Sequence, residues 1–165
     1  MSNRMSRLVA RFDGCPTWLR QGLQTLFLGS KVPFVGTARL KVEEISHQRV
    51  VVSVRNRRRV QNHIQGVHAA AMALLAETAT GFAIGMHLPD DEVPLLKTLK
   101  VDYLKRSRGD LKAVVELCPE QVRDLLSDRK GEISVPVKVT DQLGREPIRC
   151  EVIWAWIPQK RSVDP

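Results

Sequence analysis

One acidic side chain interrupts the most apolar stretch of this sequence. Residues 69–86 read AAAMALLAETATGFAIGM, and Glu77 is the one charged residue among them. A helix that is apolar on nearly every side belongs inside a protein or a membrane, but this acid and the flanking histidines argue against a membrane span. Burying an isolated carboxylate is costly and raises its pKa. Glu77 is therefore a candidate functional residue; the structural alternative is a hydrogen-bonded carboxylate at a dimer contact.

The spacing of polar groups around this stretch indicates how a site could form. His68 precedes it directly and lies nine residues before Glu77. Because successive helix residues rotate by about 100°, the two side chains project from roughly opposite sides and cannot serve one site within one chain. Two helices lying side by side about a two-fold axis can bring them together. We therefore predict a homodimer with two composite sites, each taking Asn62 and His68 from one chain and Glu77 from the other.

A metal centre is not expected in this region. His63 and His68 both precede the helix, whereas Glu77 faces away from them, so the three side chains do not form a ligand set.

Composition indicates one globular domain with an anionic partner. The 165 residues are 43% hydrophobic and 27% charged, which allows a substantial core. Cys15, Cys118 and Cys150 are odd in number and form no C-x-x-C pair, which is typical of reduced thiols. No apolar run precedes Pro16, so we expect no secretory signal and a cytoplasmic location. The net charge of +8 and the isoelectric point of about 9.9 favour phosphates, nucleotides or acidic surfaces without choosing among them.

Alternation of apolar and polar residues predicts antiparallel strands on both sides of the central helix. The predicted strands span residues 34–43, 50–54, 97–105, 111–117, 133–139 and 148–156. A short helix is expected at 119–128, with Pro119 in its first turn. A curved antiparallel sheet can wrap a helix that is apolar all round, and a partner subunit can cover what remains. The prediction is a single α+β domain over residues 34–160, preceded by an extension over residues 1–33.

The extension is expected to hold one helix. Residues 1–16 suggest a loose basic segment, and residues 16–28 suit a short amphipathic helix that stops near Gly29. Its predicted buried side consists of Trp18, Leu19, Leu23, Leu26 and Phe27.

Two motifs resemble a known family. The string Asn62-x5-His68-Ala69-x7-Glu77, together with the segment VDYLKRSRGDL at residues 101–111, resembles the hotdog-fold acyl-CoA thioesterases, in particular the phenylacetate-pathway type. The sequence is more similar still to an uncharacterised bacterial hotdog group that has an extra N-terminal helix and His-Ala in place of His-Gly. The resemblance implies a hotdog fold, in which a curved antiparallel sheet wraps one long helix.

The resemblance also implies hydrolysis of a small or medium acyl-CoA thioester between subunits, with coenzyme A as part of the substrate and no separate cofactor. Because hotdog dimers pair in several ways, the resemblance leaves both a homodimer and a dimer of dimers open. Glu77 would activate water as general base, or less often attack the carbonyl itself. The backbone N–H of Ala69 would stabilise the oxyanion, Asn62 would orient water or substrate, and His68 would fix the helix start. Lys105, Arg106, Arg108 and Arg58 would contact coenzyme A phosphates.

Two departures from the family pattern bear on activity. Ala69 and Ala70 stand where glycines are usual, and their methyl groups could crowd the thioester sulfur. Glu77 replaces aspartate and moves the carboxylate by about 1 Å, a shift that can matter to rate. The alternative function is therefore a non-catalytic hotdog module that binds acyl-CoA or a related anion.

Other functions fit the sequence less well. Hydratase chemistry uses a His and an acid, but in another motif order. Few aromatic residues accompany the basic run Arg55–Arg59, so base stacking is not favoured. We expect no nucleic-acid partner and no membrane partner. The acyl chain cannot be assigned from the sequence, because the pocket floor depends on packing between subunits.

Overall fold

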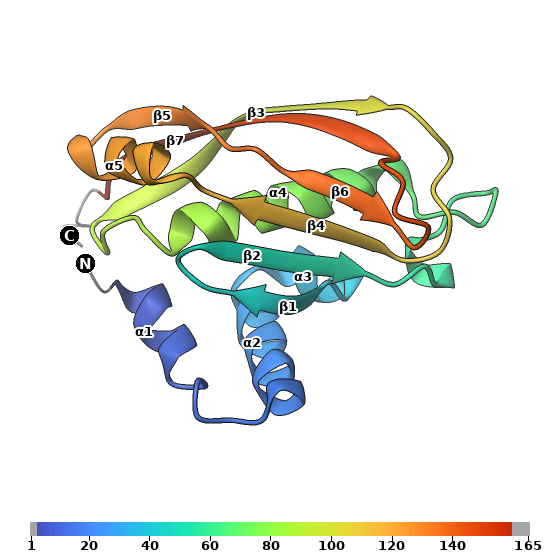
Figure 1. The fold of residues 1–165 in the computed structure, drawn as a ribbon, viewed down its shortest axis with the longest axis horizontal. Helices are drawn as coiled ribbons and strands as arrows, with labels where there is room; N and C mark the ends of the chain where they lie inside the picture. Colours follow the sequence, from blue (N-terminus) through green and yellow to red (C-terminus); the bar gives the residue numbers. More distant parts are fainter. Residues whose placement is uncertain (1–2, 160–165) are drawn as a thin grey trace, which may run out of the picture.

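The structure is a computed structural model that describes residues 3–159, and it surrounds one long helix with a curved layer of antiparallel strands (Figure 1). The helix is α4 (Ala69–Gly85). One sheet has the order β1-β2-β4-β6, with β1 (Lys41–Ile45), β2 (Arg49–Val54), β4 (Leu111–Glu116) and β6 (Lys138–Asp141). The other has the order β3-β7-β5, with β3 (Glu92–Tyr103), β7 (Ile148–Pro158) and β5 (Gly131–Ser134). Helix α5 (Pro119–Ser127) connects β4 to β5.

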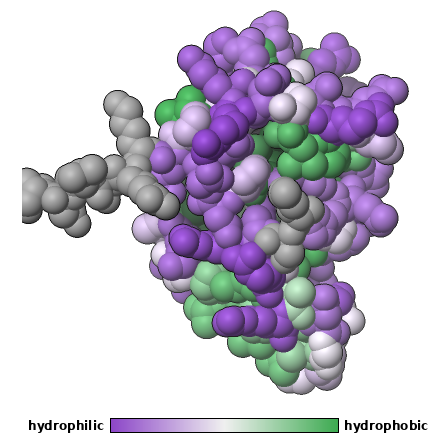
Figure 2. Space-filling model, turned by 90° about the vertical axis from the view of Figure 1, so that its left-hand side faces the viewer, coloured by the Kyte–Doolittle hydropathy of each residue, from purple (hydrophilic) through white to green (hydrophobic). Residues whose placement is uncertain are grey.

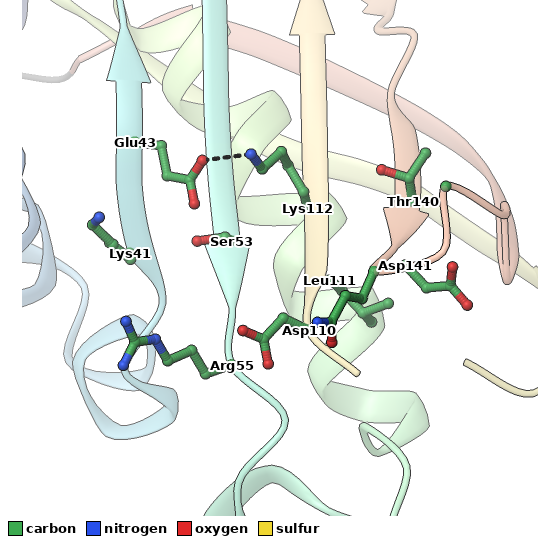
Figure 3. Close-up of a pocket in the computed structure, with 11 residues that line it drawn as sticks. Lys41, Glu43, Ser53, Arg55, Asp110, Leu111, Lys112, Thr140 and Asp141 are labelled. Atoms are coloured by element: carbon green, nitrogen blue, oxygen red, sulfur yellow. Dashed lines mark ion pairs between the residues drawn. The ribbon is translucent and has the colours of Figure 1, made fainter. Parts of the chain in front are cut away.

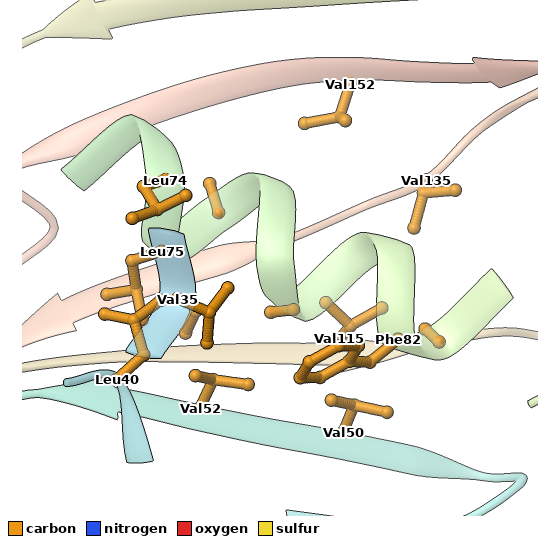
Figure 4. Close-up of a cluster of buried hydrophobic side chains, with 14 of the residues drawn as sticks. Val35, Leu40, Val50, Val52, Leu74, Leu75, Phe82, Val115, Val135 and Val152 are labelled. Atoms are coloured by element: carbon orange, nitrogen blue, oxygen red, sulfur yellow. The ribbon is translucent and has the colours of Figure 1, made fainter. Parts of the chain in front are cut away.

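Helix α4 forms the centre of the core, as its composition predicts. Strands β2, β4, β3 and β7 all contact it. Leu75, Ala76 and Ala79 are fully buried within it, and valines of the sheet pack beneath its side chains (Figure 4). The predicted α+β arrangement, with the sheet around an apolar helix, is therefore what the chain forms. None of the helices formed by residues 3–159 is long and apolar enough to cross a membrane.

Three of the predicted strands are wrong in their bounds. The strand expected over 97–105 is β3, which begins at Glu92. The strand expected from residue 34 begins at Lys41, because residues 33–38 form a helix, α3 (Pro33–Ala38), with proline in its first turn and Val35 and Ala38 buried. The strand expected over 133–139 is split into β5 and β6, and Pro136 lies between them. Proline lacks the N–H that a continuous ladder requires.

The N-terminal segment contains a helix that was not predicted. Helix α1 (Arg4–Ala10) is too short to be stable alone, and contacts made by Asn3 hold it. The Asn3 Oδ1 caps the helix by accepting from Ser6 N at 2.8 Å. Its Nδ2 donates to the carbonyls of Gly85 at 2.8 Å and Leu88 at 2.6 Å, at the end of α4.

Helix α2 (Thr17–Lys31) forms where it was predicted, but only part of its predicted buried side faces the protein. Phe27 packs against the core as predicted, whereas Trp18, Leu19 and Leu26 do not. Gln24 and Leu28 are buried, whereas Trp18 is 75% exposed and Leu26 73% exposed. The physical reason is the edge strand β1, whose backbone offers unpaired polar groups. Thr25 Oγ1 accepts from Val42 N at 3.0 Å, so polar side chains of α2 face the strand.

Candidate active site

The loop before α4 is a tight turn that uses Asn62 as its organiser. Asn62 Oδ1 accepts from Ile64 N at 3.1 Å and from Gly66 N at 3.0 Å, and Asn62 N donates to Gly66 O at 2.9 Å. Gln65, inside the turn, has a left-handed φ of 61°. The Asn62 Nδ2 donates to no group of residues 3–159 and is the part of this side chain left to meet a ligand.

His68 fixes the start of α4. It is the N-cap residue, and its Nδ1 accepts from Ala70 N at 3.0 Å. The hydrogen bond expected to fix the helix start is therefore made to the backbone. The backbone N–H of His68 donates to Val60 O at 2.8 Å. The adjacent Ala69 N–H, at the positive end of the helix dipole, has no acceptor among the described residues and is free to bind an anion. The Tyr103 hydroxyl donates to Ala69 O at 3.0 Å and ties β3 to the helix start.

Glu77 is half-buried on one face of α4 and has no partner for its carboxylate among residues 3–159. Burial raises the pKa of this carboxyl above its ordinary value. The hydrogen bonds near it do not involve its carboxylate. The buried Thr80 hydroxyl donates to the carbonyls of Ala76 and Glu77 and accepts from Trp154 Nε1 at 2.9 Å. The Trp154 ring is thereby held against Gly81, beside the carboxylate.

Two small, mainly apolar pockets lie along this face of α4 and share Leu74. The first, of about 200 Å³, contains His68, Ala70 and Ala71. The second, of about 240 Å³, contains Glu77, Thr78 and Gly81 of the helix, with Trp154 at its side. Helix α3 forms a wall of both: Phe34, Thr37 and Ala38 line the first pocket, whereas Val35 and the preceding Val32 line the second.

His68 does not point away from Glu77, as the rotation of about 100° per helical residue predicted. As N-cap residue it has extended backbone angles (φ −64°, ψ 144°), so the 100° rotation per residue does not apply to it. It lines a pocket on the same face of α4 as Glu77. The two residues are nevertheless nine positions apart, about 13 Å along the helix axis. One chain therefore places them too far apart to act on the same atoms.

The basic residues predicted to bind phosphate are exposed on two loops beside the helix start. Arg58 lies in the short 3-10 helix η1 (Arg58–Val60), and Lys105, Arg106 and Arg108 lie in the loop between β3 and β4. Arg106 Nη2 donates to Ile64 O at 2.6 Å, so this loop touches the turn that contains Asn62.

Asp141 anchors the loop between β3 and β4. Its buried carboxylate accepts from Arg108 N at 3.0 Å and pairs with Arg145 Nη2 at 2.6 Å. Burial alone would raise the pKa of this carboxyl, but the Arg145 side chain and three backbone N–H groups outweigh it and lower the pKa to about 2.

One polar residue of the site was missed. Gln61 lines the first pocket beside His68, and its side chain forms no hydrogen bond within residues 3–159. Consecutive residues of an extended segment point to opposite sides. Asn62, at the start of an Asn-x-x-x-Gly turn, is therefore directed into the turn, and Gln61 toward the pocket. That turn spacing is the sequence signal that distinguishes the two amides.

A separate, polar hollow lies on the outer face of the sheet, away from α4 (Figure 3). It measures about 510 Å³ and is lined from β1, β2, β4 and the turn after β6. Glu43 pairs there with Lys112 at 2.8 Å. Three basic and three acidic side chains line it, and Glu77 is not among its lining residues.

Comparison with known proteins identifies the family. A family model described as a domain of unknown function (DUF4442) matches residues 20–157. The chain belongs to this family. The match begins within α2 and runs to the end of β7, so the DUF4442 domain comprises most of α2, α3 and the whole sheet around α4. No protein of curated function matches the chain.

Solved structures share the fold of this DUF4442 domain. A protein of unknown function from Pseudomonas aeruginosa, described as a probable thioesterase, has a TM-score of 0.74 at 23% identity over 88% of this chain and 97% of its own. A thioesterase from Haemophilus influenzae has a TM-score of 0.65 at 10% identity, over 79% and 86%. A thioesterase family protein from Silicibacter pomeroyi has a TM-score of 0.66 at 14% identity, over 81% and 96%. The predicted hotdog fold is confirmed.

Proposed function

We propose that this protein is a thioesterase that hydrolyses small or medium acyl-CoA at a site formed by two copies of the chain. One observation carries the proposal: Glu77 is a half-buried carboxylate in an apolar pocket, with a raised pKa and no partner in the described chain. Such a group is poised to accept a proton and has no structural bond to lose. The thioesterases among the structures with this fold support the same reaction class.

The reaction follows from the Ala69 N–H at the start of α4 and the Glu77 carboxylate in its middle. Ionised Glu77 takes a proton from water, and the water oxygen attacks the thioester carbonyl carbon. The carbonyl oxygen becomes an oxyanion that accepts from Ala69 N–H, at the helix N-terminus. When the tetrahedral intermediate collapses, the carbon–sulfur bond breaks, and the leaving thiolate takes the proton from Glu77. The products are a carboxylic acid and free coenzyme A.

A second copy is required because of the separation along α4. Glu77 of one chain and the start of α4 in its partner must meet at one carbonyl carbon, since about 13 Å separates the two positions within a chain. Strand β3 pairs with β7 alone among the described strands, so its other edge is open. An open edge of 12 residues with exposed Leu95 and Leu96 is suited to pairing with another copy.

Coenzyme A would lie across the two basic loops. Arg106 lies at the turn next to the helix start, and Arg58, Lys105 and Arg108 are exposed near it in the chain. Arginine forks match phosphate oxygens well. Gln61, in the first pocket, is an additional amide for holding the thioester or the attacking water.

The direct test is release of free thiol from a panel of acyl-CoA thioesters by the purified protein. We expect hydrolysis, and we expect Glu77→Gln to lower kcat by about 10²-fold to 10⁴-fold. Glu151→Gln, which alters an exposed glutamate without an ion pair on β7, is the matched control and should change little. An unchanged rate in Glu77→Gln would remove this residue from the mechanism.

Binding without turnover is the alternative, and one observation favours it. The Ala70 N–H already donates to His68, which leaves a single free N–H at the helix start, and two alanine methyl groups surround it. Calorimetric titration with S-alkyl-CoA thioethers, which cannot be hydrolysed, distinguishes the two functions. Saturable thioether binding together with no thiol release from any thioester would establish a binding module and refute the enzyme.

A further inference from the structure

We propose that the outward side of α2 is a docking surface for an anionic lipid bilayer. The apolar face of α2 consists of Trp18, Leu19 and Leu26, which are 75%, 36% and 73% exposed. An amphipathic helix normally buries its apolar side. Here the side turned to the protein carries Gln24 and Leu28, which leaves Trp18, Leu19 and Leu26 for a partner.

Specific hydrogen bonds fix this orientation of α2. Gln21 Nε2 donates to Glu43 O at 2.8 Å, and Thr25 both accepts from Val42 N at 3.0 Å and donates to Val42 O at 3.5 Å. Rotating the helix to bury Trp18 would break these bonds and leave polar groups of β1 unpaired. The exposure of the apolar face is therefore built into the fold.

Positive charge surrounds the apolar face. Arg4 and Arg7 pair with Asp90. Beyond them, residues 11–39 contain four arginines and lysines and one acid, Asp13, for a net charge of +3 (4 − 1). Arg20 and Lys31 belong to α2 itself, and Arg39 and Lys41 follow α3. None of these four forms an ion pair within the part of the chain that the structure describes. Figure 2 shows apolar surface flanked by strongly hydrophilic side chains on the lower lobe, where α1 and α2 lie.

A hollow beside Leu26 adds to this surface. It measures about 460 Å³ and lies between α2, α3 and β1, with Gly29, Gly36 and Leu40 on its apolar floor and Arg39 and Lys41 in its lining. An apolar hollow next to two basic residues suits an anionic lipid. Its acyl chain would enter the hollow, and its phosphate would meet Arg39 and Lys41.

Charge favours a bilayer over a second copy of the chain. A two-fold contact through α2 would bring two segments of residues 11–39, each of charge +3, against each other. Anionic lipids present phosphates above hydrocarbon, which is the order that basic residues around an exposed tryptophan and leucines require. This inference does not depend on the proposed reaction. It departs from the expectation of no membrane partner.

Tryptophan fluorescence and co-sedimentation with vesicles test the proposal on the full chain. Trp18 is the one exposed tryptophan, since Trp154 and Trp156 are 8% and 2% exposed. We expect a blue shift of emission and sedimentation with phosphatidylglycerol vesicles, much weaker effects with phosphatidylcholine, and weakening by 0.5 M salt. Trp18→Ser with Leu26→Ser should reduce sedimentation by on the order of a hundredfold.

Matched variants separate docking from general adsorption. Leu143→Ser removes an equally exposed leucine, 67% accessible, from the turn after β6 and should leave sedimentation unchanged. Arg20→Gln and Lys31→Gln should weaken it by about fivefold each. Absence of binding to phosphatidylglycerol vesicles, or equal binding by the Trp18→Ser, Leu26→Ser variant, would overturn the proposal. The proposal would also be overturned if the Trp18→Ser, Leu26→Ser variant dissociated an oligomer that the wild-type protein forms without vesicles, because this face would then be an interface between copies.

Discussion

Glu77 and Asp141 are two carboxylates that the fold treats in opposite ways. Asp141 accepts several hydrogen bonds, and its pKa falls to about 2. Glu77 accepts none within residues 3–159, and burial raises its pKa. At the residue scale this contrast separates a group that holds the structure from one available for chemistry. Burial by itself does not make the distinction, because the partners of each carboxylate decide it.

The raised pKa of Glu77 predicts the pH dependence of the reaction. A general base must be ionised, so kcat/KM should rise with pH through a midpoint above 4.5, the ordinary value for glutamate.

The same raised pKa predicts a loss of stability as the pH rises. Because the folded protein disfavours ionised Glu77, its free energy of unfolding should fall as the carboxyl ionises above pH 4.5. Glu77→Gln should therefore raise Tm at pH 7, and the gain should vanish as the pH falls below 4.5. A pH profile with no midpoint above 4.5, or a lower Tm for the variant at pH 7, would contradict this assignment.

At the scale of elements, α3 and the loop between β3 and β4 define the surroundings of the site. Helix α3 forms a wall of both pockets, and its C-cap Arg39 has a left-handed φ of 52°. Arg57 Nη2 donates to the Arg39 carbonyl at 3.1 Å. Asn56 Nδ2 donates to the Gln65 carbonyl, also at 3.1 Å. Gln65 is the other non-glycine residue with a positive φ among residues 3–159. Two consecutive side chains thus hold the two unusual backbone positions that flank the first pocket.

The turn after β6 holds the basic loop, so Asp141→Asn should destabilise the protein. Asparagine cannot pair with Arg145, and an amide nitrogen facing Arg108 N–H cannot accept from it. The shift of pKa from 3.8 to about 2 corresponds to about 2 kcal/mol of unfolding free energy at pH 7. Because the folded pKa is lowered, this contribution exists above pH 3.8 and is lost as the pH falls toward 2.

Urea unfolding of the wild-type protein and of Asp141→Asn, at several pH values between 2 and 7, measures how the stabilisation by Asp141 declines with falling pH. Asp124→Asn, at an exposed aspartate of α5 without an ion pair, is the control and should be neutral. A deficit in Asp141→Asn that persists undiminished at pH 2 would mean that the carboxylate charge is not its cause.

At the scale of the whole molecule, the composite site predicts complementation between inactive subunits. Ala69→Pro should remove the oxyanion N–H without disturbing α4, because proline suits the first helical position and His68 already has the extended backbone that precedes proline. Each homodimer, Glu77→Gln or Ala69→Pro, should lose activity by at least about 10²-fold. A mixed dimer should contain one site in which both groups are wild-type.

Refolding the two variants together in equal amounts should therefore restore about a quarter of the wild-type rate of thiol release. Each variant refolded alone is the control. If the mixture is as inactive as its components, the groups act within one chain and the dimeric site is refuted.

The sequence by itself determined the centre of this protein. The apolar run 69–86 with Glu77 inside it requires a buried helix, and period-two alternation requires strands around it, because each pattern can bury its apolar residues in one way. The bounds of α4 and α5 were therefore close to those predicted, as were those of β2, β4 and β7. The hotdog fold itself was identified by resemblance, through the Asn62, His68 and Glu77 motif and the segment at residues 101–111.

Tertiary structure decided what local pattern leaves open. Helical spacing gave α2 one apolar side but could not say that the edge of β1 would take its polar side chains, which turned Trp18 outward. A rotation rule could not place His68, because a cap residue lies outside the helix. Nor could two adjacent amides be told apart until the turn used Asn62 and left Gln61 in the pocket. Each outcome depends on partners distant in the chain or on a change of backbone direction, and neither is encoded in the periodicity of a single segment.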